Sequence, residues 1–195
     1  MKDVTPFPDQ DAIRNDVAQG KFRLKLDMSD AYEQIRMKPS DVLKTAFSTI
    51  FGTLVSNIMQ QGDCNVPSTF QRLMTYIFRE YVGKFVHVYL DDIFIYSNSL
   101  ENHEDHLGKV FAILRKEEMY LSTKKVNLYA VKMDYLGHII DDDGIHADED
   151  KMLCIREWCT PRNYRGVQQF LGLVQYLAQF MPNVSAYTTP LSRMV

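Results

Sequence analysis

The chain has 195 residues, of which 46% are hydrophobic and 24% charged, so it can bury a sizeable core and is neither disordered nor of low complexity. Its formal net charge of −3 argues against attraction of the whole surface to nucleic acid, and no stretch is long enough to span a membrane. Three cysteines without regular spacing favour a soluble, reduced intracellular protein over a disulfide framework or a zinc site.

Charge is distributed unevenly along the chain. Five basic residues against one acid give residues 151–195 a net charge of +4 and leave −7 for residues 1–150. A basic C-terminal segment on an acidic body could bind phosphates locally. A solvated helical face explains the same charges about equally well.

Short helices and strands alternate in the first half of the chain. Asp9–Ala18 is expected to form a helix, because acidic residues lie at its start and Gly20 follows its end. Phe22–Asp27 alternates apolar and polar residues like a strand, which places Asp27 at the strand's end. A short helix or turn, two strands and a longer helix are expected next, over Ser29–Ile35, Thr45–Ser48, Gly52–Met59 and from Pro67 onward.

The second half continues with a helix that Ser99 can cap. On this helix His103 and His106 have a spacing that could bind a metal, but the acidic residues around them favour a solvated helix face. Further strands are expected over Val126–Ala130 and Tyr135–Ile140, and helices after Asn163 and Pro182.

Two domains are expected. Residues 1–147 mix helices with hairpin-type strands, which indicates an α+β domain with an antiparallel sheet and helices on one face. Residues 148–195 are expected to form a small helical domain. Asp141–Gly144, just before the boundary, is interpreted as a polar turn, since the EF-hand pattern would put Ile139 at its first ligand position.

The stretch Val86–Tyr96 places two adjacent aspartates between apolar runs that suit paired strands. Only Asp91 and Asp92 separate the runs, so the sequence predicts a tight hairpin with both residues in its turn. Two carboxylates about 4 Å apart repel by roughly 4 kcal/mol at an effective dielectric near 20. A divalent cation would offset this repulsion. An ordinary solvated acidic turn is the alternative.

Asp27 adds a third carboxylate at a strand end. If its strand neighbours the hairpin, the three carboxylates converge and could hold two Mg²⁺ ions. One ion would activate an attacking hydroxyl, and the other would stabilise the leaving oxygen and a triphosphate.

Several short motifs follow one another along the chain. Tyr89-Leu90-Asp91-Asp92 reads YxDD, and Lys25-Leu26-Asp27-Met28 is followed by Ala31-Tyr32. Further blocks are Lys44–Phe47, Asn65–Met74, Tyr135–His138 and Phe170–Leu173. In this order and spacing the motifs resemble the reverse transcriptase of LTR retrotransposons, most closely the gypsy type. The ordered set runs over nearly all of the chain and is far more specific than YxDD alone.

The resemblance implies a polymerase palm with reduced fingers over residues 1–147 and a thumb over residues 148–195. It implies that Asp27, Asp91 and Asp92 are the catalytic residues and bind Mg²⁺ or Mn²⁺. The Met28 carbonyl would assist them. Tyr32 would lie under the incoming sugar, where its flat ring would exclude a 2′-hydroxyl.

Two further elements would hold the nucleotide and the primer. Gln61 and Gly62 resemble the loop that packs against the nucleotide, where an amide can hydrogen-bond sugar or base and a glycine lets the backbone approach. Tyr135-Leu136-Gly137-His138 would form the primer grip, a hairpin that places the primer 3′ end.

The last implied roles concern phosphates. Arg162 and Arg165, near the start of the thumb helix, could meet the phosphates of the duplex. Lys124 or Lys125 resembles a lysine proposed to protonate the leaving pyrophosphate, although a surface lysine is the commoner case.

The resemblance therefore predicts an RNA-directed DNA polymerase core that transfers nucleotides to a primer 3′ hydroxyl by two-metal chemistry. Its partners would be an RNA or DNA template with primer and deoxynucleoside triphosphates. Compared with the family, the upstream fingers strands are expected to be lacking, and Asp63 would add a negative charge near the triphosphate. The alternative is a domesticated or degenerate reverse-transcriptase-like protein that binds nucleic acid or protein without polymerising. Truncated fingers could also support self-association.

Overall fold

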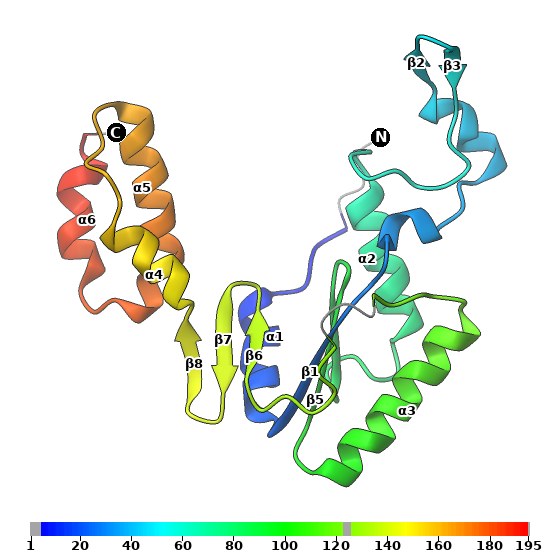
Figure 1. Cartoon of the computed structure of the whole chain (residues 1–195), viewed down its shortest axis with the longest axis horizontal. Coiled ribbons are helices and arrows are strands. Elements are labelled where there is room, and N and C mark those ends of the chain that lie inside the picture. The colour runs from blue at the N-terminus through cyan, green and yellow to red at the C-terminus, as the bar shows by residue number, and fades with distance from the viewer. Residues whose placement is uncertain (1–4, 123–125, 195) are drawn as a thin grey trace. The chain divides into compact units, whose positions relative to one another are not determined.

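The computed structural model describes residues 5–122 and 126–194, and the chain divides into two compact units, Met1–Met133 and Asp134–Val195 (Figure 1). Lys124 and Lys125 lie outside the described residues. Within the described ranges, no helix has the length and apolar character needed to cross a bilayer. The units divide earlier in the chain than the expected boundary at residues 147 and 148, so the expected palm–thumb boundary stays a proposal.

A three-stranded antiparallel sheet forms the centre of the N-terminal unit. Its strands are β1 (Phe22–Asp27), β4 (Val86–Tyr89) and β5 (Asp92–Ser97), in the order β1-β5-β4. The central strand β5 pairs along its whole length with β1, from Phe22 opposite Ser97 to Asp27 opposite Asp92. The two apolar runs expected to form paired strands do so, as β4 and β5. Ile93 and Ile95 of β5 are completely buried in the core.

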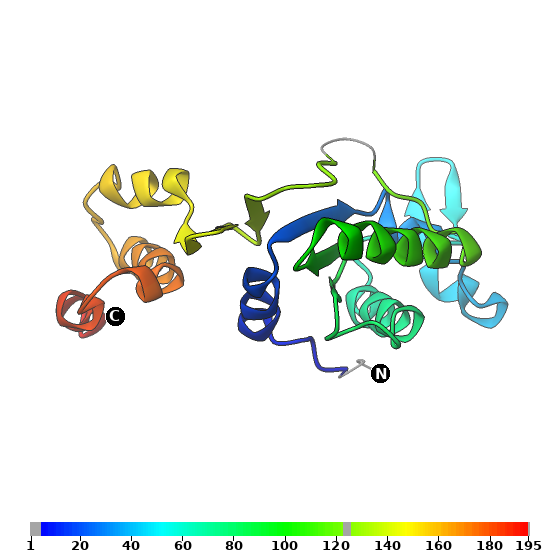
Figure 2. The same ribbon diagram turned by 90° about the horizontal axis from the view of Figure 1, so that it is seen from below.

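Two helices cover one face of this sheet. They are α2 (Val66–Ile77) and α3 (Leu100–Lys116), and Figures 1 and 2 show α3 running alongside the strands. Leu24 and Leu26 of β1 share one hydrophobic core with Phe70 of α2 and Val110 of α3. The predicted α+β architecture is thus observed.

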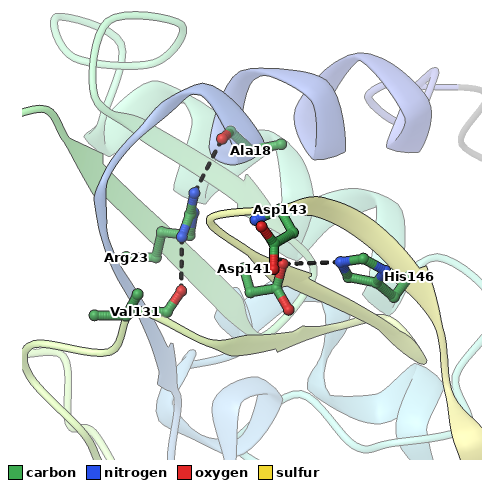
Figure 3. A network of polar contacts seen from close by, with 6 residues as sticks. All are labelled: Ala18, Arg23, Val131, Asp141, Asp143 and His146. Carbon is green, nitrogen blue, oxygen red and sulfur yellow. Dashed lines mark hydrogen bonds and ion pairs between the residues drawn. The ribbon is translucent and has the colours of Figure 1, made fainter.

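A third helix, α1 (Gln10–Gln19), packs against the opposite face of the sheet. The expected arrangement had helices on one face only, so α1 was not part of it. Arg23 of β1 donates hydrogen bonds to the carbonyl oxygens of Ala18, at 3.1 Å, and Val131, at 2.6 Å (Figure 3). Gly20 permits this docking, since a Cβ at that position would lie 2.8 Å from Cβ of Tyr96. The C-terminal end of α1 is thereby fixed onto the sheet.

The connection between β1 and α2 carries two 3₁₀ helices and a small hairpin. They are η1 (Ala31–Gln34), η2 (Pro39–Thr45), β2 (Phe47–Thr49) and β3 (Gly52–Leu54). Ile50 and Phe51 at the hairpin tip are 93% and 88% exposed. This segment therefore presents large apolar side chains to solvent.

The C-terminal unit combines an antiparallel sheet with helices. Its elements are β6 (Met133–Tyr135), β7 (His138–Asp141), β8 (Gly144–Ala147), α4 (Glu149–Arg156), α5 (Tyr164–Tyr176), η3 (Ala178–Phe180) and α6 (Val184–Ser192). The strand order is β6-β7-β8. Oδ1 of Asp141 accepts hydrogen bonds from the Asp143 amide at 2.9 Å and from His146 at 2.8 Å (Figure 3). The acidic segment is a self-bonded turn, as expected.

Three expectations about strands and about the exposure of a helix face were wrong. Val126–Ala130 is not a strand, because only Ala130 forms an isolated bridge with Arg23. Tyr135–Ile140 is not one strand, because a turn at Leu136 and Gly137 divides it into β6 and β7. His103 is not on a solvated helix face. It is completely buried.

His103 belongs to a buried hydrogen-bond chain with Ser97 and His106. His103 Nε2 lies 2.9 Å from the Leu128 carbonyl, which can only accept, so this nitrogen carries the proton. Nδ1 of neutral His103 then accepts from the Ser97 hydroxyl at 2.9 Å, and Nδ1 of His106 donates to the Ser97 oxygen at 2.8 Å. Burial lowers the pKa of both histidines below 6.5.

Because of these hydrogen bonds, we expect acid to destabilise the fold. The folded state disfavours protonated His103, so stability is complete above the unfolded pKa of 6.5 and declines as the pH falls below it toward the lower folded pKa. Replacing His103 with glutamine removes the titrating group, so the melting temperature should fall less steeply between about pH 6.5 and pH 5. Differential scanning fluorimetry of both proteins tests this. Equal slopes would contradict the assigned role of His103.

Candidate active site

Two of the three predicted carboxylates meet at one end of the sheet. Asp27 ends β1 and lies directly opposite Asp92, the first residue of β5. Tyr89 of β4 flanks Asp92 on its other side. Alternation along the strands puts these three side chains on the face opposite the α2–α3 core. The pairing expected between Asp27 and the acidic hairpin is therefore present.

The turn of the hairpin lies one residue earlier than predicted. Leu90 and Asp91 form it, whereas Asp92 already pairs in β5. Leu90 adopts a φ of +53°, a left-handed conformation that is uncommon for a residue with a Cβ. The Met28 amide donates to the Asp91 carbonyl at 3.1 Å, which ties the turn to the end of β1. Asp91 is exposed, and Asp92 is buried.

Gln71 of α2 holds this turn, and sequence reasoning did not identify it as a site residue. Its side chain is 2% exposed. Oε1 accepts from the Leu90 amide at 2.7 Å, and Nε2 donates to the Val88 carbonyl at 3.0 Å. The sequence does place a glutamine on the core face of an amphipathic helix. Since a buried amide must find polar partners, this position could have indicated a structural role for Gln71.

Lys25 lies between the two paired carboxylates. Its Nζ is 3.3 Å from Oδ1 of Asp27 and 3.0 Å from Oδ2 of Asp92. Burial raises the pKa of Asp92 to about 7, against the opposing charge of Lys25, and the neighbouring Asp27 and Asp91 add to the rise. Burial alone would lower the pKa of Lys25, but the two carboxylates outweigh it and raise that pKa.

The donor set suits a hard divalent cation. Carboxylate oxygens are the ligands that Mg²⁺ prefers, and Mg²⁺ usually takes only one or two of them together with water and substrate phosphates. Among residues 5–122 and 126–194, no group of three or more acidic, histidine or cysteine side chains is arranged to hold an ion. Asp27, Asp91 and Asp92 offer the oxygen ligands that such an ion takes, two of them paired across the sheet.

A small pocket of about 140 Å³ lies beside Asp91. It is lined by Met28, Asp30, Ala31, Tyr32, Glu33, Gln61 and Asp91. The Tyr32 ring packs edge-on against Phe70, with the centroids 5.2 Å apart, and burial together with Asp91 raises the pKa of its hydroxyl. Gly62 follows Gln61 with a φ of +108°, a conformation that favours glycine. Met28, Tyr32 and Gln61, three of the four predicted nucleotide-binding residues, thus share one pocket with a predicted catalytic aspartate.

The predicted primer grip is a tight hairpin turn of the C-terminal unit. Leu136 and Gly137 form the turn with φ angles of +46° and +81°, while Tyr135 and His138 are buried. The His138 ring stacks on Tyr176 of α5 at 5.0 Å, and the Tyr176 hydroxyl donates to the Leu136 carbonyl. Helix α5 therefore supports the hairpin from within the same unit.

Arg162 and Arg165 flank the N-terminus of α5. The helix begins after Asn163, whose side chain accepts from the Gly166 amide at 2.8 Å. Arg165 is exposed. A helix N-terminus with nearby arginines suits phosphate groups.

Comparison with known proteins shows a consistent set of relatives. A family model described as reverse transcriptase (RNA-dependent DNA polymerase) matches residues 2–140. The chain is 33% identical over 194 residues to the retrovirus-related Pol polyprotein from transposon opus of Drosophila melanogaster, covering 100% of this chain and 19% of that protein. It is 32% identical over 192 residues to the corresponding polyprotein from transposon gypsy of the same organism, covering 98% of this chain and 19% of that protein. The chain thus spans only a small part of these relatives' length.

Solved structures show the same fold. A foamy viral protease–reverse transcriptase in complex with double-stranded DNA matches with a TM-score of 0.92 at 24% identity, covering 99% of this chain and 34% of that chain. The foamy viral enzyme in complex with an RNA/DNA hybrid matches with a TM-score of 0.87, also at 24% identity, covering 99% of this chain and 26% of that chain. These likenesses confirm the palm-like α+β fold. The family match over residues 2–140 shows that the chain belongs to the reverse transcriptase (RNA-dependent DNA polymerase) family, as its resemblance to gypsy-type elements predicted.

Proposed function

We propose that the chain is the catalytic core of an RNA-directed DNA polymerase that extends a primer 3′ hydroxyl. The observation that carries this proposal is the register of the sheet. It pairs Asp27 with Asp92 and leaves Asp91, tied to Met28, at the edge of a pocket that also contains Tyr32. Carboxylates that can hold divalent ions beside a substrate pocket are what two-metal nucleotidyl transfer requires.

Asp27, Asp91 and Asp92 would hold the divalent ions, Mg²⁺ or Mn²⁺, which when bound lower the pKa of an attacking hydroxyl and stabilise the charge on the leaving phosphate. The chain's own residues orient this centre. Asp91 is exposed and available to a ligand, while buried Asp92 is held by Lys25. Asp27 is half-exposed and shares the same lysine. Asp91 and Asp27 would therefore be the main ligands, with Asp92 in support.

Tyr32 would select deoxynucleotides by its shape. Its ring is fixed against Phe70 in the pocket wall beside Asp91. Replacing Tyr32 with alanine should relax discrimination against ribonucleotides roughly 10- to 100-fold, because the wall that excludes a 2′-hydroxyl is removed. Tyr32→Phe keeps the ring and should keep the discrimination. Competition between dCTP and CTP during single-nucleotide extension measures both. Equal loss in the two variants would contradict selection by shape.

The C-terminal unit would bind the primer and template. The Tyr135–His138 hairpin and the arginines at the start of α5 are the residues proposed to contact nucleic acid. The two foamy viral structures contain double-stranded DNA and an RNA/DNA hybrid, which supports a duplex partner for this chain. Net positive charge in residues 151–195 adds a salt-dependent attraction to phosphates.

Primer extension tests the proposal. The full chain is incubated with an RNA template, a labelled DNA primer, the four deoxynucleoside triphosphates and Mg²⁺ or Mn²⁺, beside Asp27→Asn. Extension by the parent and not by the variant is expected. If neither protein extends the primer while both bind the duplex, the alternative of a degenerate reverse-transcriptase-like binding protein is correct.

The exposed tip of the β2–β3 hairpin supports association between two copies of the chain. Ile50 and Phe51 are large apolar residues almost fully in solvent, as is characteristic of contact surfaces. Light scattering at increasing concentration should show a dimer that Ile50→Asp and Phe51→Asp together abolish. A parent that remains monomeric at high concentration would contradict this association.

A further inference from the structure

Lys25 lies beside two of the three proposed metal ligands. It precedes Asp27 by two residues on β1, so both side chains lie on the same face of the strand. Its Nζ contacts Oδ1 of Asp27 and Oδ2 of Asp92 at 3.3 Å and 3.0 Å. We propose that Lys25 is a resident counter-ion that holds these two carboxylates together when no divalent ion is bound, and that it lowers the affinity of the free protein for that ion. This inference rests on the proposed function.

The surroundings of Lys25 make its two contacts more than a surface ion pair. The side chains of Lys25, Asp92 and Asp27 are 30%, 13% and 50% exposed. Two acidic side chains at this depth repel each other more strongly than in water, because the local dielectric is lower. An ammonium group between them offsets much of that repulsion without any external ion.

A divalent ion at the same place would draw on the same two carboxylates. Oδ1 of Asp27 and Oδ2 of Asp92 accept from Nζ, so an ion bound by either carboxylate competes with Lys25 for its negative charge. The positive charge of Lys25 also repels the arriving cation. Lys25 therefore stabilises the ion-free state more than the ion-bound state, and by linkage this difference lowers the affinity for the ion.

This effect would couple metal binding to nucleotide binding. Mg²⁺ in such sites is held largely by substrate phosphates and keeps few protein ligands. A protein whose carboxylates are already partly neutralised by Lys25 would bind a free ion weakly and an ion that arrives with the triphosphate more strongly. The carboxylates meanwhile stay oriented for that arrival.

A lysine with a purely structural role would behave differently. It would stabilise the protein equally with and without the ion, so its removal would lower both melting temperatures by the same amount. A resident counter-ion acts mainly on the ion-free state. The two roles can therefore be separated without any measurement of activity.

The experiment uses the full chain and Lys25→Met, which keeps a long side chain and removes the charge. Melting temperatures are recorded in EDTA and in saturating Mn²⁺, and Mn²⁺ binding is titrated by electron paramagnetic resonance of the free ion. Lys25→Arg retains the charge and tests whether the ion pair is the relevant feature. Lys21→Met removes the same charge from an exposed position just before β1 and controls for net charge. Asp27→Asn defines binding at the proposed site.

Lys25→Met is expected to melt at a lower temperature in EDTA, to regain most of that loss in Mn²⁺, and to bind Mn²⁺ about fivefold more tightly than the parent. Lys25→Arg and Lys21→Met should behave as the parent does. Equal or weaker Mn²⁺ binding by Lys25→Met, or an equal loss of melting temperature in both conditions, would overturn the inference while the proposed function stands. If the parent shows no Mn²⁺ binding that Asp27→Asn removes, the proposed metal centre itself fails, and this inference fails with it.

Discussion

Asparagine in place of Asp91 is expected to lower the rate of primer extension by at least ~10³-fold and to leave the fold intact. The exchange removes one negative charge and preserves the shape of a side chain that is exposed at the turn. Removing a single charged contact to a reacting centre typically costs about 10²- to 10³-fold, and a metal ligand costs more because the ion is misplaced as well. Single-turnover extension with saturating primer–template isolates the chemical step.

The matched control is Asp63→Asn. Asp63 is also an exposed acid of the same unit, in the loop that follows Gln61 and Gly62. Its negative charge would oppose a triphosphate, so its removal should leave the rate unchanged or raise it. A comparable fall in both variants would show that net charge matters and not the position of Asp91. An Asp91→Asn protein that retains more than about a tenth of the parent rate would contradict a metal-ligand role.

Leucine in place of Gln71 is expected to lower the free energy of unfolding by about 2–4 kcal/mol, because a buried and a half-buried backbone group lose their partners. The Leu90 amide and the Val88 carbonyl both bond to this one side chain. Leu90 also occupies a left-handed conformation that its surroundings must maintain. Extension should therefore fall as well, since the turn that carries Asp91 is no longer held. Urea unfolding monitored by far-UV circular dichroism gives the change in the free energy of unfolding.

Thr75→Ala is the control for Gln71. Thr75 is exposed on the same helix and accepts only a 3.3 Å contact from Gln71 Nε2. Its replacement should cost less than about 1 kcal/mol and spare activity. If Gln71→Leu is as stable and as active as Thr75→Ala, the support of the hairpin by Gln71 is wrong.

Much of the fold could be predicted because it follows from local pattern. The alternation in Phe22–Asp27 and the apolar stripe after Pro67 are the properties that form β1 and α2, and both elements are observed. Val126–Ala130 has the same apolar character and is not a strand. Composition shows that a segment can pair, whereas pairing also requires a neighbouring strand in register.

The site could be predicted less completely. Asp27, Asp91 and Asp92 were identified from their positions and from family resemblance, but the turn was placed one residue too late, because register across a hairpin depends on backbone geometry. Gln71 and Lys25 lie in the quoted motifs but were not identified as site residues. Their roles depend on which strand atoms lie beside them, and that information appears only when β1, β5 and α2 are brought together.

The burial of His103 also could not be predicted from its neighbours in the sequence. The acids next to it in the sequence indicated a solvated face, yet the helix turns His103 toward Ser97 and the Leu128 carbonyl. Neighbours in sequence point in different directions on a helix, so the composition around a residue does not determine its burial.

Two segments far apart in the sequence, around Asp27 and Asp91, should respond to one metal ion. Fe²⁺ substituted for Mg²⁺, with ascorbate and peroxide, generates hydroxyl radicals that cut the backbone close to the bound ion. The full chain should be cut near both Asp27 and Asp91, excess Mg²⁺ should suppress both cuts, and Asp27→Asn should lose both together. Cuts confined to one of these segments, cuts at the Asp141–Gly144 turn instead, or cuts at Asp91 that persist in Asp27→Asn would contradict a shared metal centre.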